Sequence, residues 1–83
     1  MIVYTVKEYL YKIFTGYRKM NARLKKSLTT LGIILVYGKK HIRLYKNGKS
    51  VSIPSTSSDV RAGRNIASII YNTFFNIYDT IEI

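Results

Sequence analysis

The 83-residue chain contains no cysteine, one histidine and only four carboxylates. The lack of cysteine excludes a disulfide framework, an iron–sulfur cluster and a thiolate metal site. A closed zinc site or a paired-carboxylate hydrolase would need almost every remaining candidate ligand in the chain. We therefore expect that this protein uses neither a metal nor another cofactor.

Long apolar runs are also missing. The apolar N-terminal stretch is interrupted by Lys7, Glu8 and Lys12, so it is neither a signal-peptide core nor a membrane span. The length leaves room for one compact domain, which covers residues 1–83. We expect a soluble, cytoplasmic protein.

Negative charge is scarce, and the formal net charge is +10. Residues 1–49 hold twelve of the fourteen Lys and Arg but only one carboxylate, Glu8. A concentrated positive field attracts polyanions and speeds their association. It predicts RNA, another polyanion or an acidic protein as the partner, although a basic surface that serves only solubility is an alternative.

Apolar residues recur every three or four positions between residues 9 and 31, which predicts one long first helix. Gly16 could divide it, because glycine is about 1 kcal/mol less favourable than alanine inside a helix. Gly32 is expected just after its end. Its basic opposite face would also suit a membrane surface, but a sheet offers the apolar stripe a better partner, so we expect no membrane contact. The stripe consists of Tyr9, Leu10, Ile13, Phe14, Tyr17, Met20, Leu24, Leu28 and Leu31.

Three strands are predicted after this helix, at residues 33–37, 41–45 and 49–53. Asn47 and Gly48 join the last two, because a type I′ turn needs positive φ at both central residues. Pro54 ends the third strand, since proline cannot donate to a sheet.

A second helix is expected after the Ser-Thr-Ser-Ser-Asp run at residues 55–59, which offers N-cap oxygens. Ala62 and Gly63 indicate a close approach to another element. Phe75 and Tyr78 lie off the main stripe, which suggests a homodimer or partner surface on this C-terminal helix, although packing against the first helix explains them equally well. The expected core stripe is Val60, Ile66, Ala67, Ile70, Phe74, Ile77 and Ile81.

The resulting fold class is α+β, with the order α-β-β-β-α. Both helices cover one face of a three-stranded antiparallel sheet. A two-residue turn pairs Leu44 with Val51 and Ile42 with Ile53, and these side chains face the helices. By alternation, His41, Arg43 and Tyr45 point away from the helices, so one face of the sheet is polar and partly basic.

His41 is the candidate catalytic residue. Like charges on Lys39, Lys40 and Arg43 disfavour the protonated imidazole, which leaves a base that can accept a proton. Such a base can take the 2′-hydroxyl proton of RNA while the cations stabilise the phosphoryl charge. Tyr45 offers a stacking surface for a base. The alternative interpretation of His41 is an exposed strand residue without a catalytic role.

The chain resembles the HicA-type toxins over residues 24–71. The similarity rests on a helix ending at Leu31-Gly32, on Gly38 followed closely by His41, on the Asn47-Gly48 turn and on the run Val51-Ser52-Ile53-Pro54. The family usually has one small residue where this chain has Lys39 and Lys40, and many members have a histidine after the proline.

This resemblance implies a fold like that of double-stranded-RNA-binding domains, endoribonuclease activity without a metal, and an antitoxin as partner. His41 matches the family's catalytic histidine. The alternative function is a non-catalytic binding protein, for example a phage or mobile-element inhibitor that occupies nucleic acid or an acidic host protein. The expected nucleic-acid-binding residues are Lys39, Lys40, Arg43, Tyr45, Lys46 and Lys49.

Overall fold

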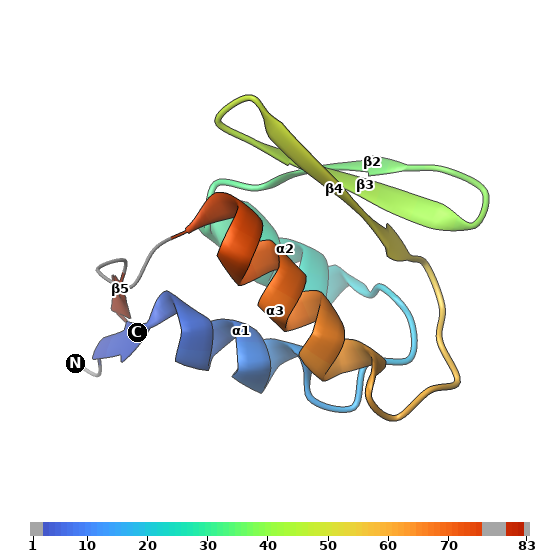
Figure 1. Cartoon of the computed structure of the whole chain (residues 1–83), viewed down its shortest axis with the longest axis horizontal. Helices are drawn as coiled ribbons and strands as arrows, with labels where there is room; N and C mark the ends of the chain where they lie inside the picture. The colour runs from blue at the N-terminus through green and yellow to red at the C-terminus, as the bar shows by residue number, and fades with distance from the viewer. Residues whose placement is uncertain (1–2, 76–79, 83) are drawn as a thin grey trace.

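The computed structural model describes residues 3–75 and 80–82 and has an α+β fold (Figure 1). Its central elements follow the order α-α-β-β-β-α, so the fold class predicted from the sequence is confirmed. A short strand is added near each end. The elements are β1 (Val3–Thr5), α1 (Val6–Phe14), α2 (Ala22–Thr30), β2 (Ile34–Tyr37), β3 (His41–Lys46), β4 (Lys49–Pro54), α3 (Ala62–Phe74) and β5 (Thr80–Glu82).

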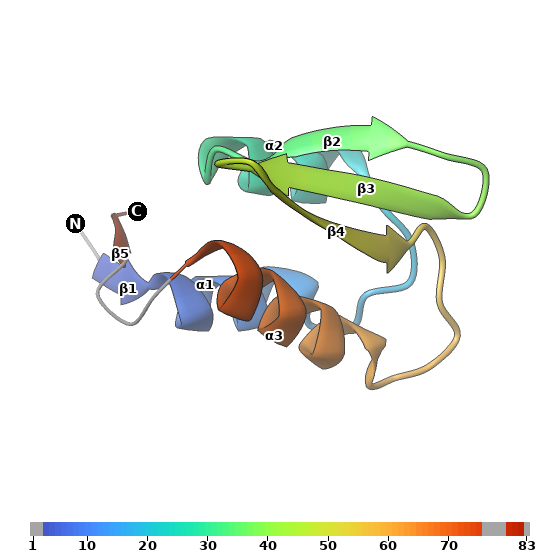
Figure 2. The same cartoon turned by 45° about the horizontal axis from the view of Figure 1, so that its top comes forward.

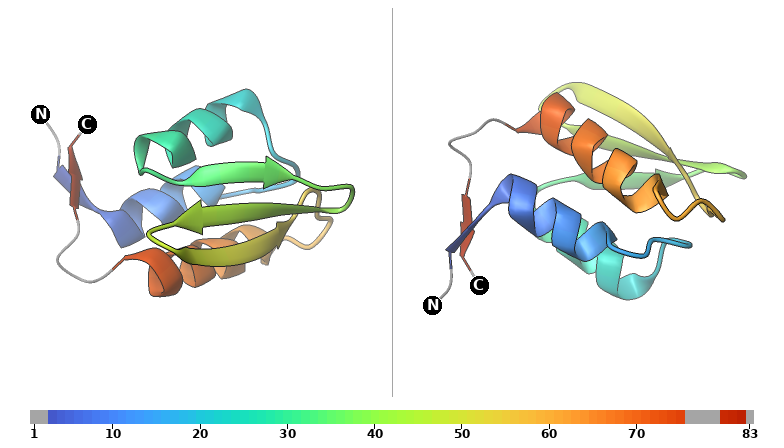
Figure 3. Two further views of the ribbon diagram at one scale, coloured as in Figure 1. Left: turned by 90° about the horizontal axis from the view of Figure 1, so that it is seen from above. Right: turned by 60° about the horizontal axis from the view of Figure 1, so that its bottom comes forward.

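The main sheet has the antiparallel strand order β2-β3-β4, and the helices lie on one of its faces (Figures 1 and 2). Figure 3 shows α2 beside β2 and α3 beside β4, with α1 between the two helices. None of the three described helices covers the other face of the sheet (Figure 2). We call it the outer face. A second, two-stranded sheet pairs β1 with β5, which the sequence analysis did not foresee.

The prediction of one long helix over residues 9–31 is wrong. Helix α1 ends at Phe14, and Gly16 takes a left-handed φ of 73° that turns the chain. Asn21 then caps α2, because its side-chain oxygen accepts a hydrogen bond from the Leu24 amide at 2.8 Å. The apolar stripe continues across the break, and its buried members are Leu10, Phe14, Tyr17, Leu24 and Leu28.

The predicted hairpin is confirmed residue by residue. Asn47 and Gly48 have φ angles of 52° and 76°, as a type I′ turn requires. Leu44 pairs with Val51 and Ile42 with Ile53. Two-residue alternation then sends Ile42 into the core and leaves His41 exposed on the outer face.

The last helix differs from the prediction at both ends. It begins at Ala62, and its N-cap, Arg61, has no capping side chain, so the serine-rich run does not cap it. Val60 was expected in the core but is 79% exposed, since it precedes the helix. The helix ends at Phe74, and Ile81 lies in β5 instead of a helical stripe. Ile77 and Tyr78 lie outside the described residues. The stripe residues that are buried as predicted are Ile66, Ala67, Ile70 and Phe74.

Gly63 sits at the contact between α3 and the end of α1. A Cβ at this position would collide with the carbonyl oxygen of Phe14 and approach the Tyr17 Cβ to 3.2 Å. The predicted close approach at Ala62-Gly63 is therefore confirmed as a helix-to-helix contact.

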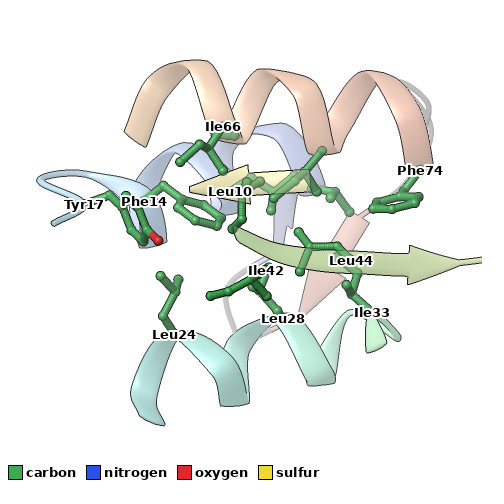
Figure 4. Close-up of a cluster of buried hydrophobic side chains, with 14 residues drawn as sticks. Leu10, Phe14, Tyr17, Leu24, Leu28, Ile33, Ile42, Leu44, Ile66 and Phe74 are labelled. Carbon is green, nitrogen blue, oxygen red and sulfur yellow. The ribbon is translucent and has the colours of Figure 1, made fainter. Parts of the chain in front are cut away.

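The core lies between the helices and the inner face of the sheet (Figure 4). Among the residues whose burial is described, all the buried side chains are apolar apart from the phenol hydroxyl of Tyr17. Within residues 3–75 and 80–82, no helix is long and apolar enough to cross a membrane.

Candidate nucleic-acid interface

The outer face of the sheet carries the predicted catalytic histidine together with Arg43 and Tyr45. All three side chains are exposed and come from alternate positions of β3. Their Cα atoms are spaced by about 7 Å, because a strand rises about 3.4 Å per residue. Strand pairing sets Val36 and Ser52 on either side of Arg43.

A shallow depression of about 310 Å³ lies on this face around His41 and Arg43. Gly38 faces His41 across the turn and donates its N–H to the His41 carbonyl oxygen at 2.8 Å. A Cβ at Gly38 would lie 2.9 Å from that carbonyl oxygen. The depression is lined by Val36, Tyr37, Gly38, His41, Arg43, Tyr45 and Ser52.

Lys39 and Lys40 form the turn that leads into β3, and both are exposed. The turn is anchored through its backbone. Ser55 donates hydrogen bonds from both its N–H and its hydroxyl to the Lys40 carbonyl oxygen, each at 3.0 Å. This fixes the backbone of the turn at the end of β3 where His41 begins the strand.

Lys46 and Lys49 are not brought to this site. They face each other at the opposite end of the hairpin, about 17 Å along the strand from His41. Alternation also turns Lys46 to the helix side, where its ammonium lies 5.4 Å from the centre of the Phe75 ring. They share neither the face nor the end of the sheet with His41, and their part in nucleic-acid binding stays a prediction.

A second group of basic residues, on the linker between α1 and α2, lies close to the Lys39-Lys40 turn. The sequence did not predict this proximity. The linker between α1 and α2 runs beside the segment that follows β4: Met20 donates its N–H to the Ser55 carbonyl oxygen, and Ser57 donates to that of Arg18 at 2.7 Å. Lys19 and Thr56 form an isolated antiparallel β-bridge. The linker and the segment after β4 are far apart in the sequence, so no local sequence pattern predicts their contact.

Tyr17 locks the same linker onto the sheet. Its hydroxyl donates to the Pro54 carbonyl oxygen at 2.6 Å. Burial raises the pKa of the Tyr17 phenol above its ordinary value, and the nearby Tyr37 phenol adds a smaller contribution in the same direction. The neutral phenol is therefore the form that the folded protein favours.

In the part of the chain that the structure describes, His, Asp and Glu side chains do not gather in groups of three or more that could hold a metal ion. The chain matches no protein-family model, and no curated protein or solved structure proved similar to it.

Proposed function

We propose that this protein is a small endoribonuclease of the HicA type, which binds RNA on the outer face of its sheet. The observation that carries the proposal is that His41 and Arg43 stand side by side on that face, next to the Lys39-Lys40 turn. His41 and Arg43 thus line one exposed depression, and Lys39 and Lys40 directly precede His41 in the chain. The resemblance of residues 24–71 to the family supports the same assignment.

In the proposed reaction His41 takes the proton of a ribose 2′-hydroxyl. The 2′-oxygen attacks the adjacent phosphorus, and the bond from phosphorus to the 5′-oxygen breaks. The leaving oxygen takes up a proton, so the products end in a 2′,3′-cyclic phosphate and a 5′-hydroxyl. Arg43, Lys39 and Lys40 stabilise the charge on the phosphoryl oxygens. Tyr45, which is 37% exposed, offers its ring to a neighbouring base.

The proposal includes a cytoplasmic location, where such an enzyme meets RNA, and an antitoxin that covers the site. The proposal also includes a homodimer through the C-terminal helix. Among the described residues, this dimer rests on the half-buried Phe75.

The test is a cleavage assay with labelled single-stranded and hairpin RNA in EDTA. We expect the wild type to cut RNA, and His41→Ala to lose cleavage by a factor of about 100 or more, since general-base catalysis contributes about 10² to 10⁴. RNA binding should survive the substitution. Equal cleavage by both proteins would refute the role of His41, and intact RNA with folded wild type would refute the enzyme.

One observation favours the second candidate, a non-catalytic binding protein. The outer face also exposes apolar side chains: Ile34 is 65% and Val36 is 51% exposed. An apolar strip beside cations suits an acidic protein partner. In that case His41→Ala would leave the activity of the protein unchanged, and Ile34→Ser would weaken binding.

A further inference from the structure

A larger hollow lies on the other side of the molecule, between α1 and α2. Its volume is about 680 Å³, and its rim carries Lys12, Arg18, Lys19 and Arg23. Asp and Glu do not occur among the described residues that line it. We call it the basic groove. Several cations, with no carboxylate among the described lining residues, attract a chain of negative charges.

The groove is held in shape by contacts of the linker between the two helices. Gly16 turns the chain after α1, Tyr17 is fixed to Pro54, and Asn21 caps α2. The first turn of α2 contains no acidic residue, so its free N–H groups add to the positive potential. The groove is therefore already formed before a ligand binds.

Backbone hydrogen bonds connect the linker that borders the basic groove to the Lys39-Lys40 turn through the segment after β4. Ser55 contacts Lys40 on one side and Met20 on the other, and Ser57 contacts Arg18. The turn, the linker and the segment after β4 lie together at one end of the molecule (Figures 1 and 3). A bound strand that passes His41 and leaves over the turn reaches the cations of the linker next.

We propose that the basic groove is a second RNA-binding subsite, which holds the phosphates of the strand beyond the cleaved nucleotide. Lys19 and Arg23, both exposed, contact the phosphates. The half-buried Tyr9 and Ile13 form an apolar wall for a base. This inference rests on the proposed function, because it needs RNA on the outer face. It extends that function by predicting that long strands bind more tightly than short ones.

The test compares two RNAs on His41→Ala protein, which cannot cut them. A trinucleotide covers about 10 Å, whereas a dodecamer covers about 41 Å at about 3.4 Å per nucleotide. The dodecamer thus exceeds the longest dimension of the molecule, 36 Å. The variant Lys19→Gln/Arg23→Gln should bind the dodecamer about tenfold more weakly at physiological salt and lower its salt slope by about 1.4, because each phosphate contact on a single strand contributes about 0.7. Its affinity for the trinucleotide should not change.

The matched control is Lys7→Gln/Lys26→Gln, which removes the same charge from helix positions outside the groove. Lys7 lies over the Tyr71 ring, and Lys26 is exposed on α2. An equal loss of affinity in both double variants would overturn the subsite, since net charge alone would then explain it. An unchanged dodecamer affinity in the groove variant would overturn it too.

The outcomes separate the two proposals. If wild type cuts the trinucleotide and the groove variant still binds the dodecamer normally, the subsite fails and the ribonuclease stands. If the parent His41→Ala protein and the wild type bind neither RNA, the proposed function fails and the subsite with it. If the groove variant loses affinity only for an oligoglutamate peptide, the groove binds an acidic protein and the RNA assignment is wrong.

Discussion

The two faces of the main sheet are built from alternate residues of the same strands, yet their environments are opposite. On β3, Ile42 and Leu44 are fully buried against the helices, whereas His41, Arg43 and Tyr45, which alternate with them, are exposed. The inner face holds the fold together, and the outer face contributes little to it. Substitutions on the outer face are therefore expected to leave the stability of the fold largely unchanged.

The largest expected effect is a difference in unfolding free energy between substitutions at two neighbouring residues of β3. Ile42→Ala should lower the free energy of unfolding by about 2 to 5 kcal/mol, because it leaves a cavity in the core. His41→Ala should change it by less than about 0.5 kcal/mol, since the side chain is exposed. Urea unfolding measures both. A large loss of stability in His41→Ala would break the distinction between the faces.

The second prediction concerns the contact between α1 and α3. Gly63→Ala should cost about 1 to 3 kcal/mol of unfolding free energy, or more, because the new methyl group meets the Phe14 carbonyl oxygen. The control is Asn65→Ala, an exposed position on the same helix. Thermal unfolding should show a lower Tm for the first variant only, and equal Tm values would contradict this close contact.

The third prediction compares the two ends of the hairpin. Lys39→Gln/Lys40→Gln should weaken RNA binding about tenfold, evenly across sequences, and flatten the salt slope by about 1.4. Lys46→Gln/Lys49→Gln removes the same charge at the far end and should have a smaller effect, since neither lysine lies at the site. Fluorescence anisotropy over a salt series distinguishes them, and equal losses would indicate a general field effect.

The smallest effect is a pH dependence. The pKa of Tyr17 is raised in the folded protein, so its contribution to stability is complete below about pH 10 and is lost as the pH rises through the folded value. Tyr17→Phe should lose about 1 kcal/mol at neutral pH with the hydrogen bond to Pro54. Its stability should then fall less steeply above pH 10 than that of the wild type. Parallel curves would show that Tyr17 does not ionise in this range.

The sequence predicted the hairpin well, because its information is local. Asn47 and Gly48 define the turn, and the turn sets the register of every pair along the two strands. The outer face follows from that register by alternation. The sequence could therefore identify His41 and Arg43 as neighbours on one surface.

Long-range contacts explain what the sequence did not predict. The apolar spacing continues through Tyr17 and Met20 although α1 ends at Phe14, because the linker also packs its apolar side chains against the core. Asn21 is a capping residue that marked the start of α2 but was not used as a signal. The pairing of β1 with β5 and the basic groove both depend on contacts between distant segments, which spacing does not encode.

The central claim is that His41 acts on a ribose 2′-hydroxyl at the outer face. The most direct measurement is the single-turnover cleavage rate of a labelled RNA and of the same strand with a 2′-deoxyribose at the cleaved nucleotide. We predict that wild type cuts the first strand and leaves the second intact, although it binds both with similar affinity. Cleavage of the deoxy-substituted strand at the same rate would contradict the claim.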